Sequence, residues 1–155
     1  MKRLQDLIDE ALQHVPEIMP WDLPERLQSR PSPLLLDVRE PDEYAAMHID
    51  GSILVPRGVL ESACEWGFDD TVPELAAGRE RPIIVVCRSG KRSALAGRTL
   101  QLLGFADVTS LKLGLRGWND DGQPLVDADG NEVDPDTADD FFRSQVSEAQ
   151  MGPQP

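Results

Sequence analysis

One short stretch concentrates the residues best suited to chemistry. It places a cysteine, three cations, two serines and a glycine within seven positions, reading Cys87-Arg88-Ser89-Gly90-Lys91-Arg92-Ser93. The reactive form of a cysteine is the thiolate, which nearby positive charge and backbone N–H groups stabilise. The chain has a formal net charge of −13, so a group of cations beside a thiol is unusual within it. We therefore expect Cys87 to act as a nucleophile.

The flanking residues predict how this loop is held. A β-branched apolar run at 83–86 precedes the cysteine, and an apolar stretch with helical spacing follows the loop. This order predicts a buried strand, a tight loop and a helix whose first N–H groups point toward the sulfur. Gly90 lets the loop curl, and Ser89 and Ser93 offer hydroxyl donors. The cations expected to hold an anionic substrate are Arg88, Lys91 and Arg92.

The alternative interpretation is an inert buried cysteine at a strand end, followed by a helix that happens to begin with basic residues. Cations in the first turn oppose the helix dipole, so three of them together require another reason for being there. We therefore favour the nucleophile. The remaining cysteine, Cys64, lies 23 positions earlier, and this separation matches no metal-ligand spacing. The sequence alone leaves a disulfide between Cys64 and Cys87 as an alternative.

Composition limits the classes of protein to consider. The chain has 155 residues, 40% of them hydrophobic, with no apolar stretch of membrane-spanning length. This indicates one globular domain that can bury a core without disulfides. A pI of about 4.4 argues against nucleic acid or an anionic membrane as partner. The charged N-terminus does not resemble a signal peptide, so we expect a reducing cytoplasm as the location.

Apolar patterns predict an α/β fold. Expected strands lie at 34–38, 53–55, 83–86 and 107–111, and expected helices or turns at 2–14, 21–28, 41–47, 58–66, 94–103 and 115–119. Gly104 occupies the position of a helix C-terminal cap. Alternation of strands and helices indicates a mainly parallel sheet covered on both faces. Ligands bind such sheets beyond the carboxyl ends of the strands, where Cys87 falls.

Both ends of the chain look like additions to this unit. Residues 1–16 hold an amphipathic helix, which we expect to pack on the domain. From residue 127 the composition becomes strongly acidic, and we interpret 127–155 as an acidic C-terminal tail that is loosely attached or partly disordered. Residues 17–126 then form the domain itself.

The ordered set of motifs resembles a single-domain rhodanese. The matching blocks are Leu36-Asp37-Val38-Arg39-Glu40, Glu43-Tyr44 with His48-Ile49-Asp50-Gly51-Ser52, Val55 to Glu61, Val86 to Ser93, and Gly114 to Trp118 followed by Gly122-Gln123-Pro124-Leu125. Two departures fall on scaffold turns. Met47 stands where the family usually has glycine before His-Ile, and Leu115-Arg116 lies near its usual Gly-Gly turn. The resemblance implies a rhodanese fold with a five-stranded sheet.

The resemblance also implies a reaction. Cys87 would take the outer sulfur of thiosulfate or of a persulfide or polysulfide, form a persulfide, and pass the sulfur to a thiophilic acceptor. That acceptor would be cyanide, a small thiol or a protein such as a sulfur carrier. The loop resembles the thiosulfate-using branch more than the mercaptopyruvate-using branch. We expect no cofactor. The residues expected to bind substrate are Arg88, Ser89, Gly90, Lys91, Arg92, Ser93 and Arg57.

Three other classes stay in view. A cysteine phosphatase with the same fold needs five residues between cysteine and arginine, whereas four separate Cys87 from Arg92. A shorter ring suits sulfur better than a tetrahedral phosphate. A binding module without activity is disfavoured because the cysteine and its cationic loop are present. A sulfur-relay carrier that turns over thiosulfate poorly remains a full alternative.

Several residues have a structural interpretation beside the functional one. Asp37 and Arg39 follow the first long strand and are expected to form an ion pair rather than to catalyse. Arg57 follows Pro56 and should reach the same edge of the sheet as Cys87, where it is a candidate for the donor site. His48 is expected to be a hydrogen-bonded turn residue.

Two further features receive no catalytic role. Cys64 could resolve a persulfide as a second thiol, but a small buried apolar role is favoured. The segment 127–131 resembles a calcium loop, yet its glycine stands at the fourth position instead of the sixth and no ladder of ligands follows. We therefore predict no metal site.

Overall fold

A parallel sheet of five strands forms the centre of the molecule. The computed structural model describes residues 1–153. The strands are β1 (Glu17–Ile18), β2 (Leu34–Asp37), β3 (Ile53–Leu54), β4 (Ile83–Val86) and β5 (Val108–Leu111). Their order is β1-β5-β4-β2-β3, and every pairing is parallel. This confirms the predicted α/β class, and the short edge strand β1 is an element that the sequence pattern did not indicate.

Short helices make most of the connections. They are α1 (Leu4–Leu12), η1 (Pro20–Asp22), α2 (Leu23–Leu27), α3 (Pro41–Ala46), η2 (Arg57–Val59), α4 (Leu60–Ala63), α5 (Pro73–Ala76), α6 (Lys91–Leu102), α7 (Gly114–Asp120), α8 (Pro135–Phe142) and η3 (Glu148–Met151). The helix predicted at 58–66 ends at Ala63, and α5 was not predicted. Gly104 follows α6 with φ +95°, which confirms the predicted C-terminal cap.

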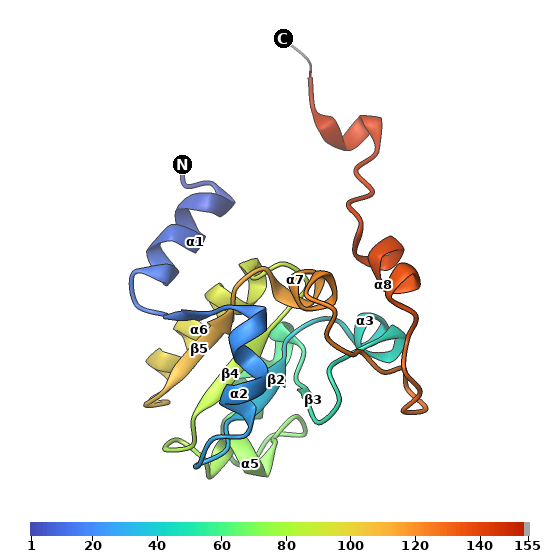
Figure 1. The fold of residues 1–155 in the computed structure, drawn as a ribbon. Coiled ribbons are helices and arrows are strands. Elements are labelled where there is room, and N and C mark those ends of the chain that lie inside the picture. Colours follow the sequence, from blue (N-terminus) through green and yellow to red (C-terminus); the bar gives the residue numbers. More distant parts are fainter. Residues whose placement is uncertain (154–155) are drawn as a thin grey trace.

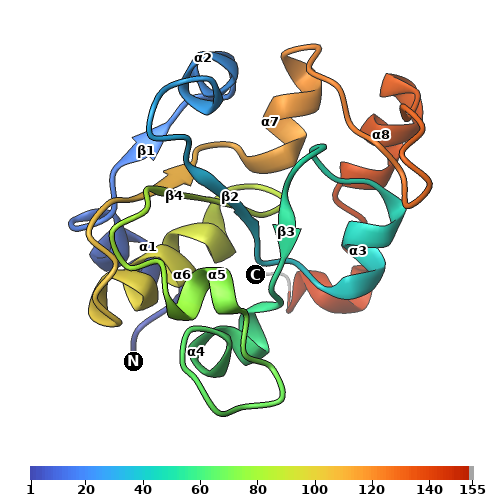
Figure 2. The same ribbon diagram turned by 90° about the horizontal axis from the view of Figure 1, so that it is seen from below.

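The sheet is buried on both faces, as predicted. Successive residues of a strand point to opposite sides, so Leu34 and Leu36 enter one core and Leu35 enters the other. The first core is closed by α4, α5 and α6, and the second by α2, α7 and α8 (Figure 1, Figure 2). This double cover accounts for the unbroken apolar runs of β2 and β4.

The N-terminal helix packs on the domain as expected. Ile8 and Ala11 are the buried residues of α1, which lies against α6. Val15 follows the helix and contacts Gly97 so closely that a Cβ at Gly97 would lie 3.0 Å from its Cγ1. In residues 1–153 no helix has both the length and the apolar character to cross a membrane.

The acidic segment is attached more firmly than expected. Asp134 caps α8 by accepting a hydrogen bond from the Asp136 N–H, and Pro135 occupies the first turn. Ala138 and Phe142, four positions apart, are buried in the second core against α7. The expectation of a loosely attached tail is therefore wrong for α8. Residues 143–153 are exposed and leave the body of the fold (Figure 1).

Candidate active site

Cys87 lies where the sequence placed it, between β4 and α6 at the carboxyl end of the sheet. Its side chain is almost fully buried, with 1% exposure. The sulfur accepts hydrogen bonds from the Gly90 N–H at 3.2 Å and the Ser93 N–H at 3.3 Å. Its Sγ also lies 3.4 Å from the Ser93 hydroxyl oxygen. Two N–H groups aimed at one sulfur form a cradle suited to a sulfur anion.

Glycine allows the loop to close around the sulfur. Gly90 has φ +91°, in the left-handed region that residues with a side chain rarely adopt. A Cβ there would lie 3.2 Å from the Leu111 carbonyl oxygen and 3.3 Å from the Leu113 nitrogen, so the neighbouring strand end also leaves little room. The predicted role of Gly90 in curling the loop is confirmed.

The start of α7 holds the loop from its outer side. The Leu115 N–H donates to the Cys87 carbonyl at 2.9 Å, and the Arg116 N–H donates to the Arg88 carbonyl at 3.0 Å. These two hydrogen bonds fix the first two residues of the loop against α7, ahead of the Gly90 and Ser93 N–H groups that donate to the sulfur. Gly114 makes this approach possible, because a Cβ at this position would collide with the backbone of Cys87 and Arg88.

The turn before α7 has two consecutive residues with left-handed backbone. Leu113 and Gly114 both have left-handed backbones, with φ of +67° and +60°. A residue with a side chain, Leu113, thus occupies a left-handed position two residues before Leu115-Arg116. The residues after Gly114 are ordinary helix.

Two of the three loop cations are bound within the protein. Arg92 forms a double ion pair with Glu43, with N–O distances of 2.8 and 2.9 Å. Arg88 donates to the carbonyl of Phe142 from Nη2 at 2.6 Å and from Nε at 3.2 Å. Lys91 is exposed and has no polar partner within residues 1–153. Arg88 and Arg92 therefore fix the loop to α8 and α3, and their contact with a substrate remains a prediction.

The Glu43–Arg92 pair perturbs both partners. Burial alone raises the pKa of Glu43, but hydrogen bonds from Arg92 and from the Glu40 N–H, with the charges of Arg92 and Arg39, outweigh it and leave that pKa below its ordinary value. The hydrogen bond to Glu43 likewise raises the pKa of Arg92, and the Cys87 sulfur adds to this effect through its charge. Arg92 thus carries a fixed positive charge that acts on the sulfur.

We expect Glu43→Gln to destabilise the fold by about 1–3 kcal/mol at neutral pH, because it removes a charged acceptor from Arg92. A group with a lowered pKa contributes stability that is present above its ordinary value of 4.5 and lost as pH falls through the folded value. Urea denaturation at neutral and acidic pH should therefore show a smaller loss on acidification in the variant. Glu74→Gln, which breaks the exposed pair with Arg81, is the matched control and should change stability by less than about 1 kcal/mol.

A buried pair of serines lies behind the sulfur. Ser93 and Ser110 are both fully buried, and their hydroxyl oxygens lie 2.7 Å apart. The Ser93 hydroxyl can reorient toward the sulfur while Ser110 completes its hydrogen bonding. Ser89, by contrast, is exposed at the loop surface.

The comparisons with known proteins agree with this geometry. Residues 21–121 match a family model described as Rhodanese-like domain. This chain belongs to the rhodanese-like family. The match covers the strands β2 to β5, the cysteine loop and α7, which are the parts of the chain that build the site.

Three relatives illustrate the range of this family. The Bacillus subtilis protein described as "Putative sulfur carrier protein YrkF" is 34% identical over 109 residues, 70% of this chain and 54% of YrkF. The polysulfide-sulfur transferase homodimer of Wolinella succinogenes is 31% identical, with a TM-score of 0.59, over 77% of this chain and 84% of that one. A Rhodopseudomonas palustris structure, RPA3614, described as a possible tyrosine phosphatase, is 27% identical, with a TM-score of 0.73, over 81% and 95%. This chain spans about half the length of YrkF.

Within this rhodanese-like domain, Asp37 and Arg39 form the expected structural ion pair. Both are fully buried, and Arg39 Nη2 lies 2.9 Å from the Asp37 carboxylate. Arg39 also donates to the carbonyls of Met47 and Glu43, at 2.7 and 3.4 Å. The pair thereby ties the end of β2 to α3, which carries the partner of Arg92. His48 is a hydrogen-bonded turn residue, as expected, with Nδ1 2.9 Å from the Tyr44 carbonyl and its ring stacked on that tyrosine.

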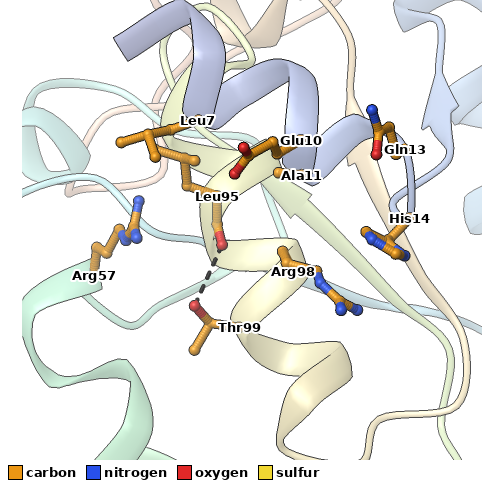
Figure 3. A pocket seen from close by; sticks show the side chains of 9 residues that line it. All are labelled: Leu7, Glu10, Ala11, Gln13, His14, Arg57, Leu95, Arg98 and Thr99. Carbon is orange, nitrogen blue, oxygen red and sulfur yellow. Dashed lines mark hydrogen bonds between the residues drawn. The ribbon is translucent and has the colours of Figure 1, made fainter. Parts of the chain in front are cut away.

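Arg57 reaches the predicted edge of the sheet. Its N–H donates to the Val38 carbonyl, and the Val38 N–H donates to the Val86 carbonyl, next to Cys87. The Arg57 side chain lines a groove of about 610 Å³ between α1 and α6, together with Leu7, Glu10 and Leu95 (Figure 3). Its assignment to the donor site remains a prediction.

Cys64 has the buried apolar surroundings that were favoured for it. It is free, fully buried in the first core, and burial raises its pKa from 9.0 to about 11. We expect it to contain about a hundredfold less thiolate near neutral pH than an ordinary cysteine and to resist iodoacetamide in the folded protein. Because the unfolded thiol ionises first, the free energy of unfolding should fall as pH rises from 9 toward 11. Rapid labelling of native Cys64 would contradict this.

Several contributors to the site were not identified from the sequence. Glu43 and Gly114 were recognised only as parts of family motifs, without their contacts to the loop. Ser110 carried a weak signal, since it alternates with Thr109 between the apolar ends of β5, and only Ser110 of the two is buried. The Phe142 carbonyl carried none, because a backbone acceptor has no signature in sequence.

Proposed function

We propose that this chain is a sulfurtransferase that carries sulfane sulfur as a persulfide on Cys87. The observation that carries the proposal is the buried sulfur with two backbone N–H groups directed at it from Gly90 and Ser93. The same groups can hold the negative charge of a persulfide, which is the intermediate that such a transfer needs.

The cycle has two displacement steps. The Cys87 thiolate attacks the outer sulfur of the donor, the donor's S–S bond breaks, and sulfite (from thiosulfate) or a thiolate (from a persulfide or polysulfide) leaves with the electron pair. An acceptor thiolate or cyanide then attacks the outer sulfur of the Cys87 persulfide and restores the Cys87 thiolate. No external oxidant or reductant is required, and the cycle has ping-pong character.

The loop residues would divide the work. The N–H groups of Gly90 and Ser93 hold the sulfur, and Ser93 adds a hydroxyl. Lys91, exposed beside them, attracts an anionic donor such as thiosulfate. Arg88 and Arg92 add fixed positive potential while they hold the loop to α8 and α3. Ser89 and Arg57 would contact the donor or acceptor outside the cradle.

The phosphatase alternative has one observation in its favour, the likeness to RPA3614. Against it stands the loop. Four residues separate Cys87 from Arg92, and Arg92 is occupied by Glu43 instead of being directed into the ring. A phosphatase would need that guanidinium for the phosphoryl oxygens. A sulfur carrier with low turnover is the stronger alternative, in line with the name of YrkF.

The direct test is sulfur loading. The purified protein is incubated with thiosulfate or with polysulfide, and its peptides are analysed by mass spectrometry. We expect one added sulfur atom on the peptide that contains Cys87, and its removal by cyanide. Failure of both donors to load a folded protein would overturn the proposal. Cys87-dependent hydrolysis of para-nitrophenyl phosphate would instead favour the phosphatase.

A second measurement separates enzyme from carrier. Thiocyanate formation from thiosulfate and cyanide is compared with handover of preloaded sulfur to protein thiols. Fast steady-state turnover indicates an enzyme, whereas fast loading and handover with slow turnover indicate a carrier. A reducing cytoplasm would suit either role, since both cysteines are free thiols.

A further inference from the structure

Two serine hydroxyls form a short chain that ends on the Cys87 sulfur. The Ser110 oxygen lies 2.7 Å from the Ser93 oxygen, and the Ser93 oxygen lies 3.4 Å from the sulfur. Ser93 belongs to the first turn of α6, whereas Ser110 is 17 residues further along the chain, in β5. The proposed cycle uses the Ser93 hydroxyl and gives Ser110 no role.

Ser110 occupies a position that suits an apolar side chain. It is paired with Val85 in the register of β5 and β4, so its side chain points to the same face of the sheet as Val85 and Cys87. Val108, two residues earlier on β5, is part of the first core on that face. Ser110 is itself fully buried. Burial of a hydroxyl costs free energy unless it is hydrogen-bonded, so a serine here depends on its partner.

That partner fixes the direction of the chain. In residues 1–153 the Ser110 hydroxyl is hydrogen-bonded to Ser93 and to no other group, and full burial keeps bulk water away from both serines. Each hydroxyl has one hydrogen to donate. If Ser93 donated to Ser110, the Ser110 hydrogen would have no acceptor and the sulfur would lose the Ser93 hydrogen. If Ser110 donates to Ser93, both hydrogens are used, and the Ser93 hydrogen goes to the sulfur.

The charge of the sulfur decides between the two directions. A sulfur anion only accepts hydrogen bonds, so it selects the direction from Ser110 through Ser93 to the sulfur. A neutral thiol also donates, so it does not select this direction. A hydroxyl that accepts one hydrogen bond becomes a stronger donor of the next. Ser110 therefore strengthens the contact between Ser93 and a sulfur anion, although its own hydroxyl is bonded to Ser93 and not to the sulfur.

We propose that Ser110 is a positioning residue for Cys87, which donates its hydroxyl hydrogen to Ser93 and so directs the Ser93 hydroxyl at the sulfur anion. The same arrangement serves the thiolate that attacks the donor and the persulfide anion that results. Each hydrogen stays on its own serine, so no proton is transferred along the chain. The inference rests on the proposed sulfurtransferase function and deepens it by adding a residue behind the cradle.

The experiment measures the ionisation of Cys87 separately from sulfur transfer. The rate of alkylation of Cys87 by iodoacetamide is followed by peptide mass spectrometry as a function of pH, and single-turnover loading is measured with thiosulfate. The variants are Ser93→Ala, Ser110→Ala and the double variant, with Ser110→Thr and Ser110→Val as a pair of equal shape that differs in the hydroxyl. Ser52→Ala is the matched control, because it removes another buried hydroxyl, which donates to the Ile49 carbonyl.

We expect Ser110→Ala to move the midpoint of the alkylation profile to higher pH by about half a pH unit, which leaves about threefold less thiolate below the midpoint. Loading there should slow by the same factor, and the alkylation rate at high pH should not change. Because Ser110 acts through Ser93, its removal should have no further effect in the Ser93→Ala background. Ser110→Thr should keep the original midpoint, and Ser110→Val should shift it as Ser110→Ala does.

The charged residues on the elements around the sulfur are the same in all these variants. They are Arg88, Lys91 and Arg92 in the loop and the start of α6, Asp37 and Arg39 at the end of β2, Glu43 in α3, Arg57 in η2, and Lys112 and Arg116 after β5 and in α7. A shift of the midpoint therefore reports the hydroxyl chain.

Two results would overturn the inference. One is an unchanged alkylation profile in a folded Ser110→Ala protein, which is what Ser52→Ala should give. The other is an equal shift from Ser110→Ala with and without the Ser93 hydroxyl. If thiosulfate and polysulfide both fail to load Cys87 in the unmodified protein, the proposed function fails, and the alkylation profiles still decide whether Ser110 acts on the sulfur.

Discussion

Cys87→Ser should lower the rate of sulfur transfer by at least about a thousandfold and abolish loading with sulfur. A serine hydroxyl is not ionised near neutral pH and forms no bond equivalent to a persulfide. The fold should survive, because a serine oxygen can accept the same two N–H groups from Gly90 and Ser93 in the same buried space. Thiocyanate production and mass spectrometry of the loaded protein measure the two effects.

The second cysteine provides the matched control. Cys64→Ala removes a thiol that lies in the first core and retains Cys87 with its loop. We expect nearly unchanged loading and a moderate loss of stability from the lost packing. Retention of activity in Cys87→Ser, or loss of activity in a folded Cys64→Ala, would show that Cys87 is not the residue that carries the sulfur.

The parts of the fold that could be predicted are those with local patterns. The run at 83–86 and the helix after the loop are specified by neighbouring residues, and both lie where the sequence placed them. The buried strand β2 was predicted for the same reason. The two residues of β1 include the charged Glu17, so no apolar run marked this strand, whereas Ile53-Leu54-Val55 marked the equally short β3. β1 nevertheless covers the edge of β5.

The charges of the loop show the limit of local reasoning. Arg88 and Arg92 were expected to face a substrate because they lie near Cys87 in sequence. Their partners, the Phe142 carbonyl and the Glu43 carboxylate, are 54 and 49 residues away. Such contacts depend on how distant helices pack. Neither the charge of a side chain nor its spacing from the cysteine predicts these long-range contacts.

The acidic segment was misjudged through its composition. High charge indicated a loose tail, but two apolar residues four positions apart were enough to bury one side of α8. This matters for the site, because α8 supplies the carbonyl that holds Arg88. The charged side chains remain on the outer surface of the helix, where they keep their hydration and therefore have no desolvation cost.

We expect Gly114→Ala, which adds a single methyl group, to lower both the stability of the fold and the rate of sulfur loading. A Cβ would overlap the carbonyl group of Arg88 and lie 2.5 Å from the Cys87 oxygen, and φ is +60°. Relief requires moving the loop away from α7, which turns the N–H groups away from the sulfur. We expect a loss of about 2–5 kcal/mol of stability and about a hundredfold of loading rate.

Gly122→Ala separates the collision at Gly114 from the cost of a left-handed backbone. Gly122 has φ +79° but open space around its Cβ position, so this variant should lose only about 1–2 kcal/mol of stability and keep its loading rate. Urea denaturation and single-turnover loading measure both quantities. If the two alanine variants behave alike, the contact between α7 and the loop does not position the sulfur. A loss of activity confined to Gly114→Ala would instead show that the cradle depends on the carbonyls held by α7. The chemistry of Cys87 would then be set by α7, which packs on its loop, as well as by α6, which follows the loop.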